Sequence, residues 1–283
     1  MNHLLCFGFG YSAQTFVKRL DSRVWKISAT SRDAAGISEI DAQGIRGFLF
    51  DSKLRIAPDI THLLISAPPD EHGDPVLRLF REQLQRLSKQ LQWVGYLSTT
   101  GVYGDRGGER VDENSPLEPN TARGHRRLDA EQSWLKLRKD SGLPVHLFRL
   151  AGIYGPGRNQ LLTVLNGSAK RIIKPGQIFS RIHVDDIAGV LAASIAKLNP
   201  GRAYNVCDDE PCPPQEVVEY AANLLGLPLP PEIPFEEAEL SPMAKSFYAD
   251  SKRVSNQRIK SELGYKLIYP TYREGLTAIK AAL

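Results

Sequence analysis

The stretch His3-Leu4-Leu5-Cys6-Phe7-Gly8-Phe9-Gly10-Tyr11-Ser12-Ala13 decides the fold of this 283-residue chain. An apolar run typical of a buried strand passes into a glycine turn, after which apolar residues recur at helical spacing. Gly8 permits a tight turn, and Gly10 lets the backbone approach a ligand closely. The N–H groups of Tyr11 and Ser12, at the start of the helix, would face a diphosphate. We therefore expect a dinucleotide site, with a purely structural glycine turn as the alternative.

The composition is that of an ordinary globular protein, with 42% hydrophobic and 24% charged residues. The formal net charge is +4, and no basic run is long enough to predict nucleic-acid binding. Residues 187–196 are apolar but far short of the ~20 residues that span a bilayer, so no membrane partner is expected. Cys6, Cys207 and Cys212 lack metal-ligand or CxxC spacing, and the chain enters a strand at once. We expect reduced thiols, no metal, no signal peptide and a cytoplasmic location.

Strand-like and helix-like segments alternate through the first half of the chain. The apolar runs that we expect to be strands are residues 4–7, 26–30, 47–50, 62–66, 93–98 and 145–150. Helix-length stretches separate several of them, and residues 76–91 carry apolar side chains at helical spacing. This alternation predicts an α/β fold, a doubly wound parallel sheet of the Rossmann type covered by helices on both faces.

The composition changes after residue 155, and prolines gather between Pro211 and Pro242. We expect a dinucleotide-binding Rossmann domain over residues 1–155 and a smaller C-terminal α/β lobe on the substrate side over residues 156–283. Two strand-like segments near residues 181–206 are expected to return to the main sheet. We expect a cofactor in the cleft between these two parts.

The end of the second expected strand, about 20 residues after the glycines, is where this fold binds the adenosine ribose. Ser31 and Arg32 offer space and a guanidinium suited to a 2′-phosphate, which favours NADP. Asp33 keeps NAD open, because a shift of one residue in the strand end would place a carboxylate at the ribose. Arg32 as a solvated surface charge is the structural alternative.

Two further strand ends carry candidate cofactor residues. Asp51 follows the third strand where an adenine amine would lie, and a plain turn carboxylate is the alternative. Ser66, Ala67 and Pro68 follow the fourth strand, at the carboxyl edge of the sheet where cofactors lie.

More specific motifs recur in order along the chain. They are Ser98-Thr99-Thr100-Gly101-Val102-Tyr103-Gly104, Arg149 with Tyr154-Gly155-Pro156-Gly157, His183-Val184-Asp185-Asp186 and Tyr204-Asn205-Val206. In order and spacing the chain resembles the extended short-chain dehydrogenase/reductases, the NAD(P)-dependent epimerase/dehydratase family, over nearly its whole length. The glycine pattern and the C-terminal tail are most similar to the YeeZ-like branch of that family.

The resemblance implies a catalytic Ser or Thr after the fifth strand and a Tyr-x-x-x-Lys on the next helix. Thr99 matches the first position, with a local backbone hydrogen bond as the alternative. Arg123 stands where the tyrosine belongs and Arg127 where the lysine belongs. A guanidinium cannot act as a general base near neutral pH, so the proton relay of the family does not carry over. Arg127 could still bind the nicotinamide ribose, and a solvated basic helix face is the alternative for both arginines.

Other residues of the matched motifs are candidates for substrate contact. Thr100, Tyr103, Tyr154 and Arg181 belong to segments that shape the substrate pocket in the family, although packing alone is the alternative for the two phenols. Two guanidiniums beside the cofactor would suit an anionic substrate such as a nucleotide sugar.

The resemblance implies an NADP- or NAD-dependent oxidoreductase or epimerase/dehydratase that acts on a small polar molecule. Because the tyrosine is missing, an NADP-binding sensor or scaffold without redox turnover is the second hypothesis. A homodimer is also open, since residues 76–91 and 128–137 could pair across a two-fold axis as helices do in dimers of the family.

Overall fold

The computed structural model describes the backbone of residues 1–283 and every side chain except those of residues 242 and 243. Internal contacts divide the chain into two units, each assembled from three separate stretches. The first unit comprises Met1–Thr99, His125–Arg149 and Ile187–Tyr204, and the second comprises Thr100–Gly124, Leu150–Asp186 and Asn205–Leu283. The division near residue 155 that the sequence suggests stays a prediction.

A seven-stranded sheet organises the first unit, with the strand order β11-β7-β5-β4-β1-β2-β3. Its strands are β1 (Asn2–Phe7), β2 (Trp25–Ser31), β3 (Arg46–Leu49), β4 (His62–Ile65), β5 (Trp93–Thr99), β7 (Val145–Leu150) and β11 (Ala203–Val206). The pairs β1–β2, β2–β3, β1–β4 and β4–β5 are all parallel. Strand β1 lies between β2 and β4, so the chain winds outward from β1 in both directions, which confirms the predicted doubly wound α/β fold.

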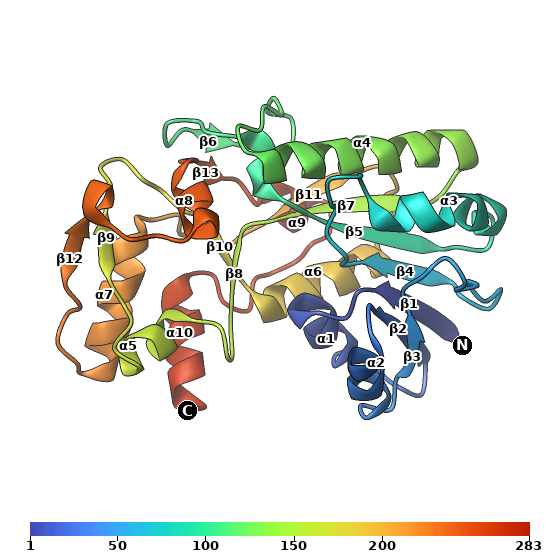
Figure 1. Ribbon diagram of the computed structural model, residues 1–283, viewed down its shortest axis with the longest axis horizontal. Coiled ribbons are helices and arrows are strands. Elements are labelled where there is room, and N and C mark those ends of the chain that lie inside the picture. The colour runs from blue at the N-terminus through green and yellow to red at the C-terminus, as the bar shows by residue number, and fades with distance from the viewer. The chain divides into compact units, whose positions relative to one another are not determined.

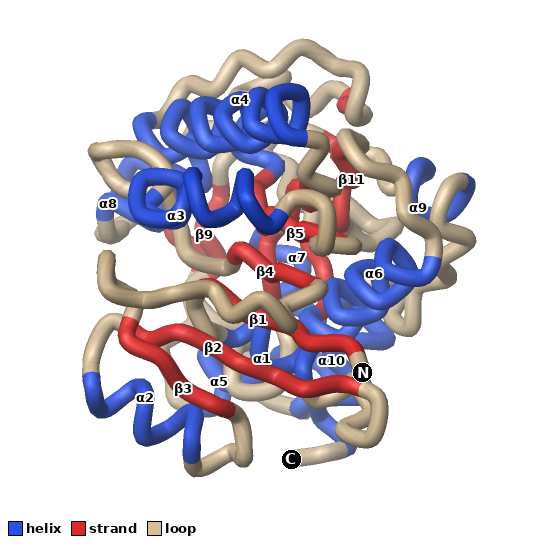
Figure 2. Tube along the Cα trace, turned by 90° about the vertical axis from the view of Figure 1, so that its right-hand side faces the viewer, coloured by secondary structure: helices blue, strands red, loops and turns tan.

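Helices cover both faces of this sheet. They are α1 (Tyr11–Val17), α2 (Ala34–Asp41), α3 (Pro75–Leu87), α4 (Ala122–Ser141) and α6 (Val184–Ala196). Figure 1 shows α3 and α4 side by side over β4 and β5, and Figure 2 shows β1, β2 and β3 side by side with α2 next to β3. On the opposite face, Trp93 of β5 contacts the ring of Phe16 from α1 and donates a hydrogen bond to Ser194 of α6.

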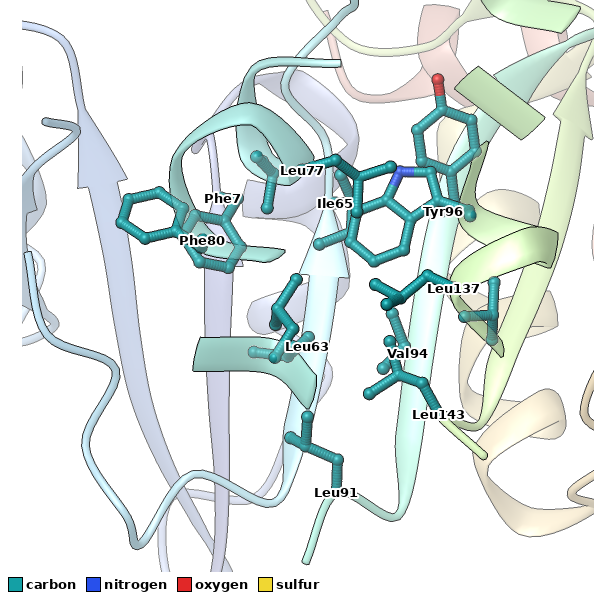
Figure 3. Close-up of a cluster of buried hydrophobic side chains, with 14 of the residues drawn as sticks. Phe7, Leu63, Ile65, Leu77, Phe80, Leu91, Val94, Tyr96, Leu137 and Leu143 are labelled. Carbon is teal, nitrogen blue, oxygen red and sulfur yellow. The ribbon is translucent and has the colours of Figure 1, made fainter. Parts of the chain in front are cut away.

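The core beneath α3 and α4 is continuous and apolar. Alternate residues of β1, β4 and β5 point toward these helices, as the period of two in a strand requires. Figure 3 shows Phe7, Leu63, Ile65, Val94 and Tyr96 from the strands against side chains of both helices. Strands buried on both faces explain why their sequences read as near-continuous apolar runs.

The predicted strands agree with the observed ones to within two residues at each end. The helix expected over residues 76–91 ends earlier, at Leu87. It begins after Asp74, whose carboxylate accepts hydrogen bonds from the backbone N–H groups of Val76 and Leu77 at 2.9 Å and caps the helix. The apolar Leu91 beyond the helix packs into the core from the turn that leads to β5, so apolar spacing overstated the helix length.

The second unit contains short elements. Its strands form the pairs β8 (Gly152–Tyr154) with β10 (Arg181–His183), β9 (Arg171–Ile173) with β12 (Glu232–Pro234) and β6 (Arg110–Val111) with β13 (Arg253–Val254). Its helices are η1 (Thr100–Tyr103), α5 (Gln160–Leu165), α7 (Pro214–Leu225), η2 (Phe235–Glu237), α8 (Pro242–Tyr248), α9 (Gln257–Ser261) and α10 (Tyr272–Ala281). Apolar side chains of α5, α7 and α10 form its main core. Thus β11 belongs to the seven-stranded sheet, whereas β10 pairs with β8. Within the part of the chain that the structure describes, no helix is long and apolar enough to cross a membrane.

Candidate functional site

The glycine turn lies at the point where the strand order reverses. β1 pairs with β2 on one side and with β4 on the other, and the connections from β1 and β4 leave the sheet in opposite directions. In open α/β sheets, ligands bind at the carboxyl ends of the strands at such a point. The residues that follow β1, β2, β3 and β4 are therefore the first to consider for a dinucleotide.

Gly8 is fixed by contacts from two neighbouring strand ends. Its φ of +83° lies in the left-handed region, and an added Cβ would come within 3.0 Å of the backbone nitrogen of Ala67. Its N–H donates a hydrogen bond of 2.9 Å to the hydroxyl of Thr30 near the end of β2. The N–H groups of Ser66 and Ala67 donate to the carbonyl of Phe7 at 2.9 and 2.8 Å. The turn is thus held between β2 and β4, a role of Thr30 that the sequence analysis did not identify.

Gly10 stands in a different environment from Gly8. Its backbone is extended, with φ −85° and ψ −170°, and an added Cβ would meet no atom within 4 Å. It precedes α1, which has no side-chain cap, and the N–H groups of Tyr11 and Ser12 stand at the start of this helix. Open space beside Gly10 at a helix N-terminus without a side-chain cap fits the diphosphate of a dinucleotide.

The end of β2 presents Arg32 while Asp33 is engaged elsewhere. Asp33 is the N-cap of α2, and its carboxylate accepts the N–H of Gly36 at 2.8 Å. The side chain of Ser31 packs so closely on Gly36 that a Cβ there would lie 2.1 Å from its hydroxyl oxygen. Arg32 is exposed. Among Ser31, Arg32 and Asp33, it is therefore the carboxylate of Asp33 that is engaged in capping a helix.

The other strand-end candidates lie where the topology predicts. Asp51 follows β3, and its carboxylate accepts the N–H groups of Lys53 and Leu54 at 2.9 and 3.2 Å, as a turn carboxylate does. Ser66 and Ala67 are half-buried against the glycine turn, and Pro68 is exposed. Contact of Asp51 with adenine stays a prediction.

At the end of β5, Arg127 of α4 is anchored to the strand that carries Thr99. Its Nη1 donates to the carbonyl of Leu97 at 2.5 Å and to the hydroxyl of Tyr96 at 3.2 Å, and its guanidinium lies 5.7 Å from the centre of the Tyr96 ring. Burial raises the pKa of the Tyr96 hydroxyl well above its usual value, so this phenol stays protonated. Arg127 therefore fixes the end of β5 through one nitrogen and keeps its remaining donors.

A buried ion pair that the sequence analysis did not identify supports the same strand end. Glu131 of α4 accepts a 2.5 Å hydrogen bond from the hydroxyl of Ser98, next to Thr99, and pairs with Arg149 of β7 at 2.8 Å. The side chains of Glu131 and Arg149 are 2% and 5% exposed. The sequence did contain one signal for this ion pair. Glu131 is a charged residue among the apolar inner positions of α4, one helical turn after Arg127.

In the second unit, Arg123 and Tyr103 contact neighbouring side chains. The Arg123 guanidinium lies 5.5 Å from the ring centre of Phe247 in α8, a cation–π contact. The hydroxyl of Tyr103 donates to the side-chain oxygen of Asn205 at 2.8 Å, and Thr100 begins η1. The fully buried Tyr103 is therefore held by a hydrogen bond within this unit.

Tyr154 and Arg181 lie in a buried polar cluster of the same unit. Arg181 donates through Nη1 to the carbonyl of Phe179 and to the sulfur of Cys212, both at 3.1 Å. The Tyr154 hydroxyl donates to the carbonyl of Thr271 at 3.4 Å. Burial raises the pKa of Tyr154 well above its usual value, and the nearby carboxylate of Asp208 adds to this shift. Tyr154 is not a phenol that loses its proton near neutral pH.

One constellation in the first unit has the connectivity of a hydrolase triad. The ring of His3 lies 2.8 Å from the hydroxyl of Ser28 through Nε2 and 3.0 Å from the carboxylate of Asp59 through Nδ1. Ser28 is fully buried within β2, so no substrate can reach its oxygen. This triad is a structural hydrogen-bond network.

The fold has a glycine turn and a helix N-terminus at the reversal point of a parallel sheet, with the exposed Arg32 at the end of β2. These are features of dinucleotide-binding α/β proteins. The family model described as "NAD dependent epimerase/dehydratase family" matches residues 76–207. A structure of a functionally unknown conserved protein from Silicibacter pomeroyi DSS is 52% identical, with a TM-score of 0.93 over 100% of this chain and 99% of that chain.

Two curated relatives match along nearly the whole chain. Protein YeeZ of Escherichia coli K12 is 25% identical over 95% of this chain and 97% of its own length. The 3-diazoavenalumate denitrifying reductase of a Streptomyces species is 26% identical over 98% of this chain and 99% of its own length. The family model and these relatives support the NAD-dependent epimerase/dehydratase family, the extended short-chain dehydrogenase/reductases. They likewise support an NAD(P)-dependent protein of the class that contains epimerases, dehydratases and reductases.

More distant structures share the fold. The dTDP-glucose 4,6-dehydratase of Bacillus anthracis, in complex with NAD, is 19% identical, with a TM-score of 0.81 over 100% of this chain and 97% of its own. Human epimerase family protein SDR39U1, with NADPH, is 17% identical, with a TM-score of 0.76 over 99% of this chain and 100% of its own. The first of these is bound to NAD and the second to NADPH.

Proposed function

We propose that this protein is an NADPH-dependent reductase of a small anionic acceptor. The observation that carries the proposal is the glycine turn, where Gly8 is locked between β2 and β4 and Gly10 leaves open space over an uncapped helix start. The nicotinamide coenzymes bound to the dehydratase of Bacillus anthracis and to the human protein agree with this assignment. The three cysteines are buried and free, which supports a cytoplasmic location.

The coenzyme would be held by backbone at one end and by side chains along its length. Gly8, Gly10 and the N–H groups of Tyr11 and Ser12 would hold the diphosphate, while Ser31 and Arg32 would bind a 2′-phosphate. The adenine and the backbone of the coenzyme would lie along Asp51 and the segment of Ser66, Ala67 and Pro68. When bound, the nicotinamide supplies a hydride.

We expect Arg32→Ala to weaken NADPH binding about tenfold and to leave NADH binding unchanged, because only NADPH carries the phosphate that the guanidinium would pair with. The capping of α2 by Asp33 supports this preference, because that carboxylate is held by a helix terminus. Calorimetric titration with both coenzymes tests it. Lys53→Ala, which removes another exposed cation near the sheet edge, should alter neither affinity. Equal losses for the two coenzymes would contradict the assignment.

The side chains around the matched catalytic positions limit how a proton can be supplied. Helix α4 contains no tyrosine, and the guanidiniums of Arg123 and Arg127 do not release protons near neutral pH. Tyr103 already donates to Asn205, and the hydroxyl of Tyr154 has a raised pKa. A substrate that must receive a proton from a phenol is therefore poorly served by these residues.

An acceptor that carries its own leaving group avoids this requirement. When a diazonium takes one hydride at carbon, its C–N bond breaks and N2 leaves with the bonding pair, so charge balances without a proton. The relative from Streptomyces is named as a reductase of a diazo compound, which supports this class of reaction. Thr99 would orient the acceptor, and Arg127 of the same unit would favour a carboxylate or phosphate on it.

The test compares two classes of acceptor with the same protein and coenzyme. Purified protein with NADPH is expected to consume the coenzyme with a carboxylated aryl diazonium and to release N2 in equal amount. It should leave simple aldehydes and ketones unreduced, because these need a proton donor. Consumption with the carbonyl compounds alone would contradict the proposal. Tight NADPH binding without consumption by any acceptor would favour the sensor or scaffold.

A further inference from the structure

A groove in the first unit runs along α3, and its lining has more basic than acidic side chains. Its volume is about 930 Å³, within the range of small-molecule sites, and its walls come from α3, the segments after β3 and before α3, and one position of α4. Four arginines line it, namely Arg55, Arg78, Arg81 and Arg86. No residue that we assign to the coenzyme, and no matched catalytic position, lines this groove.

Three of these four arginines have no carboxylate partner among the residues that the structure describes. Both carboxylate oxygens of Asp74 are occupied, by the N–H groups that it caps and by the indole N–H of Trp134 at 3.1 Å. Arg78 pairs with Asp70 at 2.7 Å. Glu82 is the other acid that lines the groove. Among the residues that the structure describes, Arg81 and Arg86 have no hydrogen-bond or ion-pair partner.

The groove has a fixed wall opposite α3. The Arg55 guanidinium donates to the carbonyls of Ser52 and Leu54 at 3.0 and 3.2 Å, so it is already oriented. The side-chain amide of Gln83 in α3 bridges the same segment, because its oxygen accepts the N–H of Ile56 and its nitrogen donates to Leu54. A basic groove with restrained walls loses less entropy when a ligand binds than a free surface does.

We propose that this groove is a second anion site, which binds an oligophosphate chain independently of the coenzyme. Along the axis of α3, Arg81 and Arg86 are separated by about 7.5 Å, a length suited to several linked phosphates rather than a single one. Guanidinium groups pair with phosphate oxygens through two parallel hydrogen bonds, which suits the three arginines that lack a carboxylate partner. An inorganic phosphate chain and that of a nucleotide share this chemistry and differ only in what is attached to one end.

The experiment is calorimetric titration of the full chain with inorganic triphosphate and with adenosine triphosphate, each in the presence of saturating NADPH. We expect binding of the inorganic compound to weaken about tenfold in Arg81→Glu/Arg86→Glu and to tighten in Glu82→Gln, which removes the opposing carboxylate. Lys136→Glu, the same charge reversal on the exposed face of α4 outside the groove, should leave the affinity unchanged. Tighter binding of the nucleoside compound would identify a nucleotide as the ligand, and equal binding a free phosphate chain.

Three results would overturn the assignment. The first is that neither compound binds, and the second is that wild type and the double arginine variant bind equally well. The third is that NADPH displaces triphosphate, which would place the anion on the glycine turn. Thermal unfolding of each variant checks that the fold is intact, and the tighter binding expected of Glu82→Gln cannot arise from a damaged fold. Sedimentation of the free chain gives a further outcome, since a homodimer that buries α3 would cover the groove and also contradict the proposal.

Discussion

Replacing Glu131 by alanine is expected to lower the free energy of unfolding by about 3–5 kcal/mol, because it leaves the guanidinium of Arg149 buried without its counter-charge. The two side chains are 2% and 5% exposed and contact each other at 2.8 Å, so solvent cannot replace the lost carboxylate. The hydroxyl of Ser98 also loses its acceptor. Equilibrium unfolding in urea measures the change.

The matched control breaks an ion pair that water surrounds. Arg23 pairs with Asp21 at 2.7 Å, with side chains that are 88% and 43% exposed. Arg23→Ala should therefore leave the unfolding midpoint unchanged. If Glu131→Ala unfolds at the same denaturant concentration as wild type, the pair does not hold β5, α4 and β7 together as we describe.

Gly10→Val is expected to weaken NADPH binding at least about tenfold while leaving the fold intact. An added Cβ would meet no atom within 4 Å and the backbone at this position is extended, so we expect the folded chain to accept the side chain. The same side chain would occupy the space that we assign to the diphosphate. Titration with NADPH and thermal unfolding, measured on the same sample, separate the two effects.

Gly8→Ala serves as the control, because we expect it to lower stability, whereas Gly10→Val should leave stability unchanged. Gly8→Ala adds a Cβ at 3.0 Å from a backbone atom of Ala67, at a φ of +83°. We expect it to cost about 1–3 kcal/mol of stability, since a side chain is strained in that conformation. Unchanged coenzyme affinity in Gly10→Val would show that the turn does not contact a diphosphate.

The fold could be predicted from the sequence because its signals are local and repeated. Each apolar run has the length of a buried strand, and the turn after Phe7 needs glycine for reasons that hold in any context. The early end of α3 could not be predicted, because Leu91 continues the apolar spacing while packing from a turn. Periodicity reports burial, and burial does not distinguish the last turn of a helix from the loop after it.

The site was harder to predict because its supporting contacts join residues far apart in the chain. The sequence identifies the glycines and the basic strand end through their spacing. The bond from Gly8 to Thr30 and the pair of Glu131 with Arg149 depend on which strands are neighbours, which spacing alone does not reveal. Arg127 is an example. The sequence shows a cation at that position, but only the structure shows that it binds the carbonyl of Leu97 at the end of β5.

The hydrogen bond between Thr30 and the glycine turn has a consequence for altering coenzyme preference. Thr30 immediately precedes Ser31 and Arg32, and its hydroxyl also donates to the carbonyl of Cys6 at 3.4 Å. Exchanging residues 31–33 for those of an NAD-selective protein retains this tether, whereas an exchange that begins one residue earlier releases it. Redesign of this protein should therefore treat Thr30 as part of the glycine turn, because its hydroxyl holds that turn and it directly precedes the residues that we propose to select between the two dinucleotides.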